Sequence, residues 1–159
     1  MAHSPVIAVG ADHGGYQLKQ RLLRALAKAG WRARDVGTHR EAPCDYPRYA
    51  ATVGQAVAAG RAARGLLICK SGAGMAIAAN KVSGVRAVVV QTLASARQSR
   101  RHNDANVLVL GAVGLTPAKA ERLLETWLAT DFEGGRHARR IRQITQLERA
   151  SAQRRRLLS

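Results

Sequence analysis

Residues 69–74, Cys-Lys-Ser-Gly-Ala-Gly, combine a thiol with a glycine-rich turn. They follow an apolar run and precede a helical pattern, so their backbone N–H groups would lie at the positive end of a helix and could hold a phosphate or an oxyanion. The same donors would favour the thiolate form of Cys69. Neither a Walker A ending nor G-x-G-x-x-G spacing is present, so a tight turn beside an inert cysteine is the alternative.

Two histidines with polar neighbours are candidates for proton transfer. His13 follows Asp12, and His102 precedes Asn103. Imidazole exchanges protons near neutral pH, which suits general acid–base catalysis. A single histidine is often structural, but each of these falls in a loop beside an expected strand.

A basic group lies near the carboxyl terminus, where Arg136, His137 and Arg140 have i, i+1 and i+4 spacing. On a helix this spacing brings the two guanidinium groups to one face, where they could bind a phosphate together. A solvated basic face is the alternative interpretation.

Short apolar runs and longer helical patterns alternate along the chain. The runs typical of strands cover residues 6–10, 31–36, 65–69, 85–90 and 107–110. Apolar residues at three- and four-residue spacing predict helices between and after them. These helices are expected over residues 18–29, over 49–57, in a stretch ending at Ala79, over 93–101 and 117–128, and finally over 136–153.

This alternation predicts an α/β fold, with βαβ units forming a parallel sheet that helices cover on both faces. Ligands of such sheets bind beyond the carboxyl ends of the strands. We therefore expect three polar segments to meet at one edge of the sheet: Asp12-His13, residues 69–74, and the His102-Asn103 pair before the last strand.

The charge is strongly positive: 26 Lys and Arg against 10 Asp and Glu give +16 over 159 residues. The length suits a single domain over residues 1–159, with its core at about 6–131. Nucleic-acid binding would fit the charge but not the scarcity of aromatic residues or the lack of a helix-turn-helix or zinc motif. Scattered basic residues such as Lys19 are expected on solvated helix faces, and residues 154–156 are expected to fray.

The cysteines, the length of the apolar runs and the first residues indicate the compartment and the absence of membrane contact. Two cysteines, Cys44 and Cys69, do not make a disulfide framework. No segment approaches the roughly 20 apolar residues that cross a bilayer. The first residues, 1–5, carry neither a basic stretch nor a cleavage site. We expect a cytoplasmic protein with no membrane partner.

Several sequence blocks occur together in an order that resembles one family, the ribose-5-phosphate isomerase B / galactose-6-phosphate isomerase family. The similarity extends over about residues 6–148. The blocks are Gly-Ala-Asp-His-Gly-Gly at 10–15, Asp-Tyr-Pro at 45–47, residues 68–81, residues 99–107 and Glu-Gly-Gly-Arg-His at 133–137.

This resemblance implies a Rossmann-like three-layer α/β/α sandwich with a five-stranded parallel sheet and an extra C-terminal helix at a dimer interface. It implies a homodimer, with a tetramer as the alternative, whose active sites use both subunits. The implied reaction interconverts ribose 5-phosphate and ribulose 5-phosphate through a cis-enediolate, without metal or cofactor.

Residue roles also follow from the resemblance. Cys69 would be the base that moves the proton, in a loop with Ser71, and His102 would assist ring opening. Backbone N–H groups at Gly72–Gly74 would hold the enediolate oxygen. The substrate-binding positions implied are Asp12, His13, Tyr46, Gly72, Gly74, Asn103, Arg136, His137 and Arg140.

Two positions depart from the family pattern. Lys70 stands where a glycine is usual, and Val113 stands where an arginine that contacts the phosphate is common. Lys70 could favour the thiolate of Cys69, and Lys70 or Arg101 could replace the missing cation. These departures keep two alternatives open: an isomerase of another aldose 6-phosphate, such as allose or galactose 6-phosphate, and a sugar-phosphate-binding protein without turnover.

Overall fold

The computed structural model describes residues 5–157. The expectation about the amino terminus therefore falls largely on residues 1–4, outside the described part. Within residues 5–157 no helix has both the length and the apolar character needed to cross a membrane.

Five strands form a single sheet in which every neighbouring pair is parallel. The strand order β2-β1-β3-β5-β4 places β3 at the centre. Its residues Leu66, Leu67 and Ile68 are fully buried because helices cover both faces of the sheet. The bounds are β1 (Val6–Ala11), β2 (Arg32–Asp35), β3 (Arg64–Cys69), β4 (Ala87–Val89) and β5 (Val107–Gly111).

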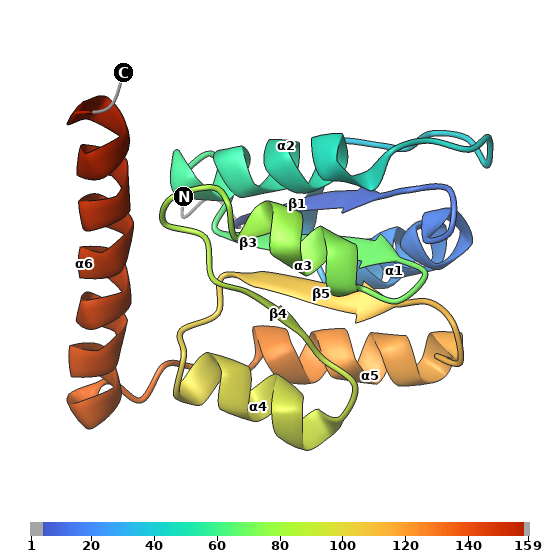
Figure 1. The fold of residues 1–159 in the computed structure, drawn as a ribbon. Helices are drawn as coiled ribbons and strands as arrows, with labels where there is room; N and C mark the ends of the chain where they lie inside the picture. Colours follow the sequence, from blue (N-terminus) through green and yellow to red (C-terminus); the bar gives the residue numbers. More distant parts are fainter. Residues whose placement is uncertain (1–4, 158–159) are drawn as a thin grey trace.

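Helices form the outer two layers of the sandwich (Figure 1). One face packs against α1 (Tyr16–Lys28), α4 (Leu93–Arg101) and α5 (Pro117–Leu128), which contribute Leu22, Leu123 and the fully buried Trp127 to that core. The other face packs against α2 (Tyr46–Ala58) and α3 (Ala73–Ala79). This arrangement confirms the three-layer α/β fold.

One basic residue does not lie where the sequence suggested. Lys19 on α1 was expected on a solvated face, and that expectation is wrong because the side chain is fully buried. Its Nζ lies 2.5 Å from Oδ2 of Asp35, at the end of β2. An ammonium group can be buried in this way when a carboxylate balances its charge.

The last helix, α6 (Gly135–Leu157), stands beside the sandwich rather than within its layers (Figure 1). It is longer than the expected 136–153, and the prediction that residues 154–156 fray is wrong because the helix continues through them. It contacts the turn before β4 through Glu148, whose carboxylate accepts hydrogen bonds from the Gly84 N–H at 3.1 Å and the Ser83 hydroxyl at 3.2 Å.

Candidate active site

Cys69 is the last residue of β3 and is only 5% exposed. The backbone N–H of Gly72 donates to its Sγ at 3.1 Å. Gly72 has φ of +83°, a conformation that residues with a side chain rarely adopt, so the glycine allows the turn that aims this N–H at the sulfur. The sequence prediction of a thiol beside a glycine turn at a strand-to-helix junction is confirmed in its geometry.

The end of β5 supports this loop from the side. The N–H of Ala112 donates to the Cys69 carbonyl at 2.8 Å, and the N–H of Val113 donates to the Lys70 carbonyl at 3.1 Å. A Cβ at Gly111 would lie 2.6 Å from the carbonyl oxygen of Ser71, so only glycine permits this close approach. The loop that carries the thiol is therefore held by its neighbour in the sheet.

The loop after β1 brings Asp12 and His13 to the same edge of the sheet. Oδ1 of Asp12 accepts a hydrogen bond from the Gly15 N–H at 3.1 Å. Nδ1 of His13 accepts one from the Cys44 N–H at 3.2 Å, which leaves Nε2 as the protonated nitrogen of the neutral ring. Because the Asp12 N–H donates to the Ile68 carbonyl at 3.3 Å, this loop is tied to the strand that ends in Cys69.

Two side chains cover the glycines of these loops. Tyr46, at the start of α2, lies so close to Gly74 that a Cβ there would be 2.5 Å from its Cζ. Lys70 lies against Gly14, where a Cβ would be 2.6 Å from the Lys70 Cγ. The edge around Cys69 is thus bounded by an aromatic ring on one side and a lysine on another.

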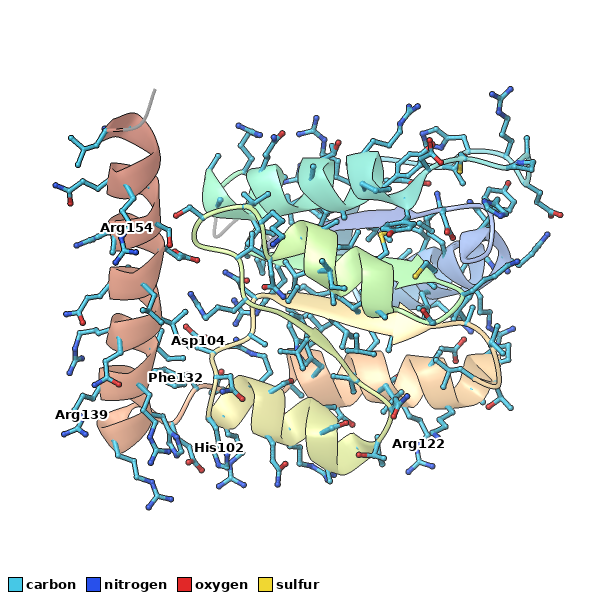
Figure 2. All side chains as sticks on the ribbon, in the orientation of Figure 1. His102, Asp104, Arg122, Phe132, Arg139 and Arg154 are labelled. Carbon is cyan, nitrogen blue, oxygen red and sulfur yellow. The ribbon has the colours of Figure 1, made fainter. Side chains whose placement is uncertain are left out.

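His102 directly follows α4 and does not lie at this edge. The pairing of β3 with β5 runs from Gly65, which pairs with Val107, to Cys69, which pairs with Gly111. Because His102 precedes Val107, it lies beyond the amino ends of the strands. Figure 2 shows it on the side of the molecule that faces α6. The expectation that all three polar segments meet at one edge is therefore wrong for a single chain.

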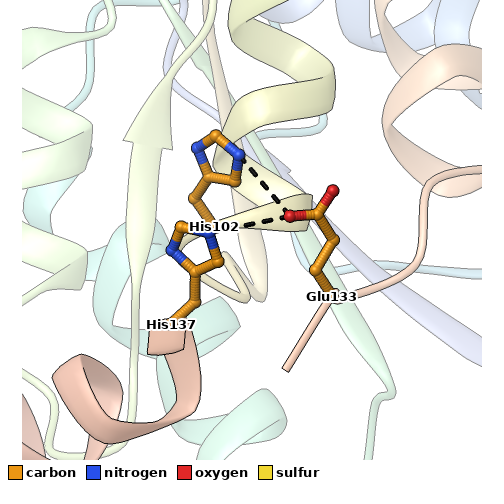
Figure 3. A group of neighbouring side chains, drawn as sticks. All are labelled: His102, Glu133 and His137. Carbon is orange, nitrogen blue, oxygen red and sulfur yellow. Dashed lines mark ion pairs between the residues drawn. The ribbon is translucent and has the colours of Figure 1, made fainter. Parts of the chain in front are cut away.

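At this amino edge His102 belongs to a compact group with Glu133 and His137 (Figure 3). The two imidazole rings stack, with centroids 4.3 Å apart and planes within 8°. Oε2 of Glu133 lies 3.7 Å from Nε2 of His102 and 3.6 Å from Nε2 of His137. The sequence placed His102 and His137 in one site, and the structure brings these two together.

The surroundings of this group lower the pKa values of Glu133 and His137. A hydrogen bond from Arg101 holds the pKa of the Glu133 carboxyl below its usual value. Burial, followed by the neighbouring His102, lowers the pKa of the His137 imidazole. At neutral pH this group therefore combines a carboxylate with a neutral His137 ring.

The remaining basic candidates lie on α6, and Asn103 lies beside that helix. Arg136 and Arg140 are exposed one turn apart in the first turns of α6, as their spacing predicted. Asn103 lines a hollow of about 560 Å³ together with Ile144 and Leu147 of α6. The phosphate-binding candidates and the thiol thus belong to opposite edges of the sheet within one chain.

Two acidic residues without a role predicted from the sequence, Glu133 and Asp104, bind the basic side chains at the amino ends of the strands. Glu133 is bonded to Arg101 and sits between the two histidines. Asp104 pairs with Arg86 at 3.0 Å and with the buried Arg100 at 2.8 Å. The i, i+4 spacing of Glu133 with His137 and of Arg100 with Asp104 was the signal that could have revealed them.

Comparison with known proteins gives one consistent group. Residues 7–144 match the sequence model of the family described as Ribose/Galactose Isomerase. The chain is 46% identical over 144 residues to ribose-5-phosphate isomerase B of Escherichia coli strain K12, an alignment that covers 89% of this chain and 95% of that protein.

Solved structures agree with the sequence comparison. The ribose-5-phosphate isomerase B of Clostridium thermocellum superposes with a TM-score of 0.91 at 44% identity, over 92% of this chain and 99% of that one. The enzyme of Mycoplasma genitalium, with ribulose 5-phosphate bound, superposes with a TM-score of 0.88 at 35% identity, over 92% and 99% of the two chains.

Proposed function

The chain belongs to the ribose/galactose isomerase family, and from that membership we propose that Cys69 is the base in an aldose–ketose isomerisation. The reaction is the interconversion of ribose 5-phosphate and ribulose 5-phosphate, for which the similar proteins are named. The observation that carries the proposal is a buried thiol with a backbone N–H aimed at its sulfur, at the edge of the sheet that holds Asp12 and His13.

The proton at C2 of open-chain ribose 5-phosphate is acidic because it is next to the C1 carbonyl. The Cys69 thiolate removes this proton, and the electron pair moves onto the carbonyl oxygen to give a cis-enediolate. The resulting thiol returns the proton to C1, while the C2 hydroxyl loses its proton and the C1 oxygen gains one. The N–H groups at Gly72–Gly74 and the hydroxyl of Ser71 are donors that would stabilise the charge on the enediolate oxygens.

The carboxylate of Asp12 and the Nε2–H of His13 are suited to hold the sugar hydroxyls. Both side chains are fixed by backbone hydrogen bonds, so little freedom is lost when a substrate binds. Tyr46 would close the pocket over Gly74. These residues form one half of the site.

The other half comes, in this proposal, from a second copy of the chain. His102 for ring opening, Asn103 for a sugar oxygen, and Arg136, His137 and Arg140 for the phosphate lie at the edge opposite Cys69. A homodimer in which α6 of one subunit reaches the partner would join the two halves. Ile144 and Leu147, two exposed apolar side chains on α6, are available for that contact.

Many members of the family have an arginine at the position of Val113. Lys70 is the most suitable residue to replace the charge of that arginine. Val113 is 76% exposed, and it lines the same groove of about 650 Å³ as Lys70 and Ser71. Arg101, the other candidate, is already paired with Glu133 at the opposite edge. We infer that Lys70 contributes a positive charge to the Cys69 half of the site.

Turnover of a panel of pentose and hexose phosphates tests the whole assignment. We expect ribose 5-phosphate to be converted, and Cys69→Ala to lower kcat by about 1,000-fold, because general-base catalysis is lost. Cys44→Ala is the matched control and should keep the wild-type rate.

Each outcome separates a different alternative. Full activity in Cys69→Ala would exclude the proposed base. Preference for a hexose 6-phosphate would favour the other aldose-phosphate isomerases. Binding of sugar phosphates without any turnover by the wild-type protein would identify a binding protein and overturn the isomerase assignment.

A further inference from the structure

We propose that His102, Glu133 and His137 form a site for a divalent transition metal of the zinc class. Two imidazoles and one carboxylate are a common ligand set for Zn²⁺ when one coordination position stays open. The candidate ligand atoms all lie within 4.8 Å of one another. The proposal concerns metal binding and does not require the isomerase reaction.

The distances are close to those of a metal site. A tetrahedral ion with bonds of about 2.1 Å holds its ligand atoms about 3.4 Å apart. Oε2 of Glu133 is 3.7 Å and 3.6 Å from the Nε2 atoms of His102 and His137. The carboxylate oxygen is therefore within a few tenths of an ångström of the spacing to each imidazole that a shared ion requires.

The side chains differ in how far they must move. A metal lies near the plane of each imidazole that binds it, whereas these rings are stacked and parallel within 8°. The His137 side chain is 8% exposed and stays in place, while that of His102 is 39% exposed and can turn about its side-chain torsions. His137 and Glu133 form the fixed part of the site, and His102 closes it.

The partners of Glu133 prepare it for this role. Its Oε1 accepts a hydrogen bond from Nε of Arg101 at 2.6 Å, and its backbone N–H donates to the Arg101 carbonyl at 3.0 Å. Oε2 is thereby directed toward the histidines, as the second oxygen of a metal-binding carboxylate usually is when the first is hydrogen-bonded.

The positive charge around the site and its two imidazoles together favour transition metals over Ca²⁺ and Mg²⁺. Arg101 lies beside Glu133, and Arg136 and Arg140 are on the same helix as His137, so a cation meets repulsion as it approaches. Ca²⁺ and Mg²⁺, which depend on several oxygen ligands, are disfavoured here. Zn²⁺, Cu²⁺ and Ni²⁺ gain enough from two imidazoles to bind.

One consequence rests on the proposed function. A metal on Nε2 of His102 removes the nitrogen that would carry a proton during ring opening, so the bound ion inhibits turnover and a chelator restores it. The binding measurement below needs no substrate, so failure of the isomerase assignment would leave it unaffected.

A calorimetric titration of the metal-free full-length chain with Zn²⁺ tests the site. We expect one ion per chain and an affinity at least about 30-fold lower in Glu133→Gln, which keeps the shape of the side chain but removes its charge. Asp131→Asn, two residues away and exposed, is the matched control and should bind within about 3-fold of wild type.

Absorption spectra with Co²⁺ as the probe identify the ligands. Imidazole and carboxylate ligands give visible d–d bands that His137→Gln abolishes and that His39→Gln, at an exposed histidine elsewhere, leaves intact. A strong thiolate charge-transfer band lost in Cys69→Ser, or unchanged Zn²⁺ affinity in Glu133→Gln, would overturn the proposal.

Discussion

At the scale of single residues, the pair formed by Lys19 and Asp35 buries a positive charge that needs a counter-charge. The Lys19 side chain is fully buried, while that of Asp35 is 25% exposed, so the carboxylate can keep some hydration and the ammonium cannot. Oδ1 of Asp35 also accepts the Gly37 N–H at 2.9 Å, which fixes its position beside α1. Within residues 5–157, Asp35 is the carboxylate that pairs with this buried ammonium.

Asp35→Ala should lower the free energy of unfolding by about 3 kcal/mol, because the Lys19 ammonium would remain buried without a counter-charge. Denaturant unfolding measures this loss. Glu121→Ala, which removes the partner of the exposed Arg21, is the control and should cost under about 1 kcal/mol. Adding Lys19→Met to Asp35→Ala should restore most of the stability; no recovery would show that the carboxylate acts through Gly37 instead.

At the scale of elements, α6 has less packing within the single chain than its length and apolar residues call for. It is a 23-residue helix beside the sandwich, and its apolar Ile144 and Leu147 remain exposed. An isolated amphipathic helix gains most of its stability from packing. A second copy of the chain, as proposed above, would supply that packing.

Replacing both Ile144 and Leu147 with Asp should separate the proposed dimer into monomers in sedimentation experiments. Because both side chains are exposed in the single chain, the far-ultraviolet circular dichroism should stay close to wild type. Isomerase activity should fall at the same time, since the two halves of the site would no longer meet. Gln143→Asp with Gln146→Asp adds the same charge to the same helix and should leave the dimer intact.

The sequence predicts where most elements lie, but it predicts their lengths less well. The apolar runs located all five strands, and helical spacing located α4 and α5 to the residue, because those patterns are local. Strand β4 was predicted over 85–90 but spans only Ala87–Val89, since pairing with β5 sets its length.

The site was less predictable because it depends on long-range geometry. Candidate residues could be named from their types, but His102 was placed at the wrong edge of the sheet. A loop that precedes a parallel strand lies at its amino end, since the helix before it runs back across the sheet. The counter-ion of Lys19 lies sixteen residues further along, on another element, and no local pattern indicates it.

At the scale of the whole molecule, the charge of +16 acts on any anionic ligand. Ion pairs such as those of Arg100 and Arg101 involve acidic residues that this sum already subtracts. The net charge creates a positive potential that raises the local concentration of phosphorylated sugars. The same potential weakens as salt screens it over about 10 Å at 0.1 M.

We therefore expect kcat/KM for ribose 5-phosphate to fall by about 5-fold between roughly 20 mM and 300 mM salt, with kcat changing by less than about 2-fold. Steady-state kinetics in sodium chloride and in potassium acetate at equal ionic strength measures it. Equal effects of the two salts would indicate screening. A response to only one of them would indicate a specific ion effect and contradict this expectation.

The placement of Cys69 and Arg136 at opposite edges of one sheet has a genetic consequence. In the proposed two-subunit site, Cys69→Ala and Arg136→Ala damage different halves, so each variant alone should be inactive. Mixed after dissociation, or produced in one cell, they should complement each other, because every mixed dimer contains one site with both halves intact. About a quarter of wild-type activity is expected from random pairing, and two defective alleles would then support growth that neither supports alone.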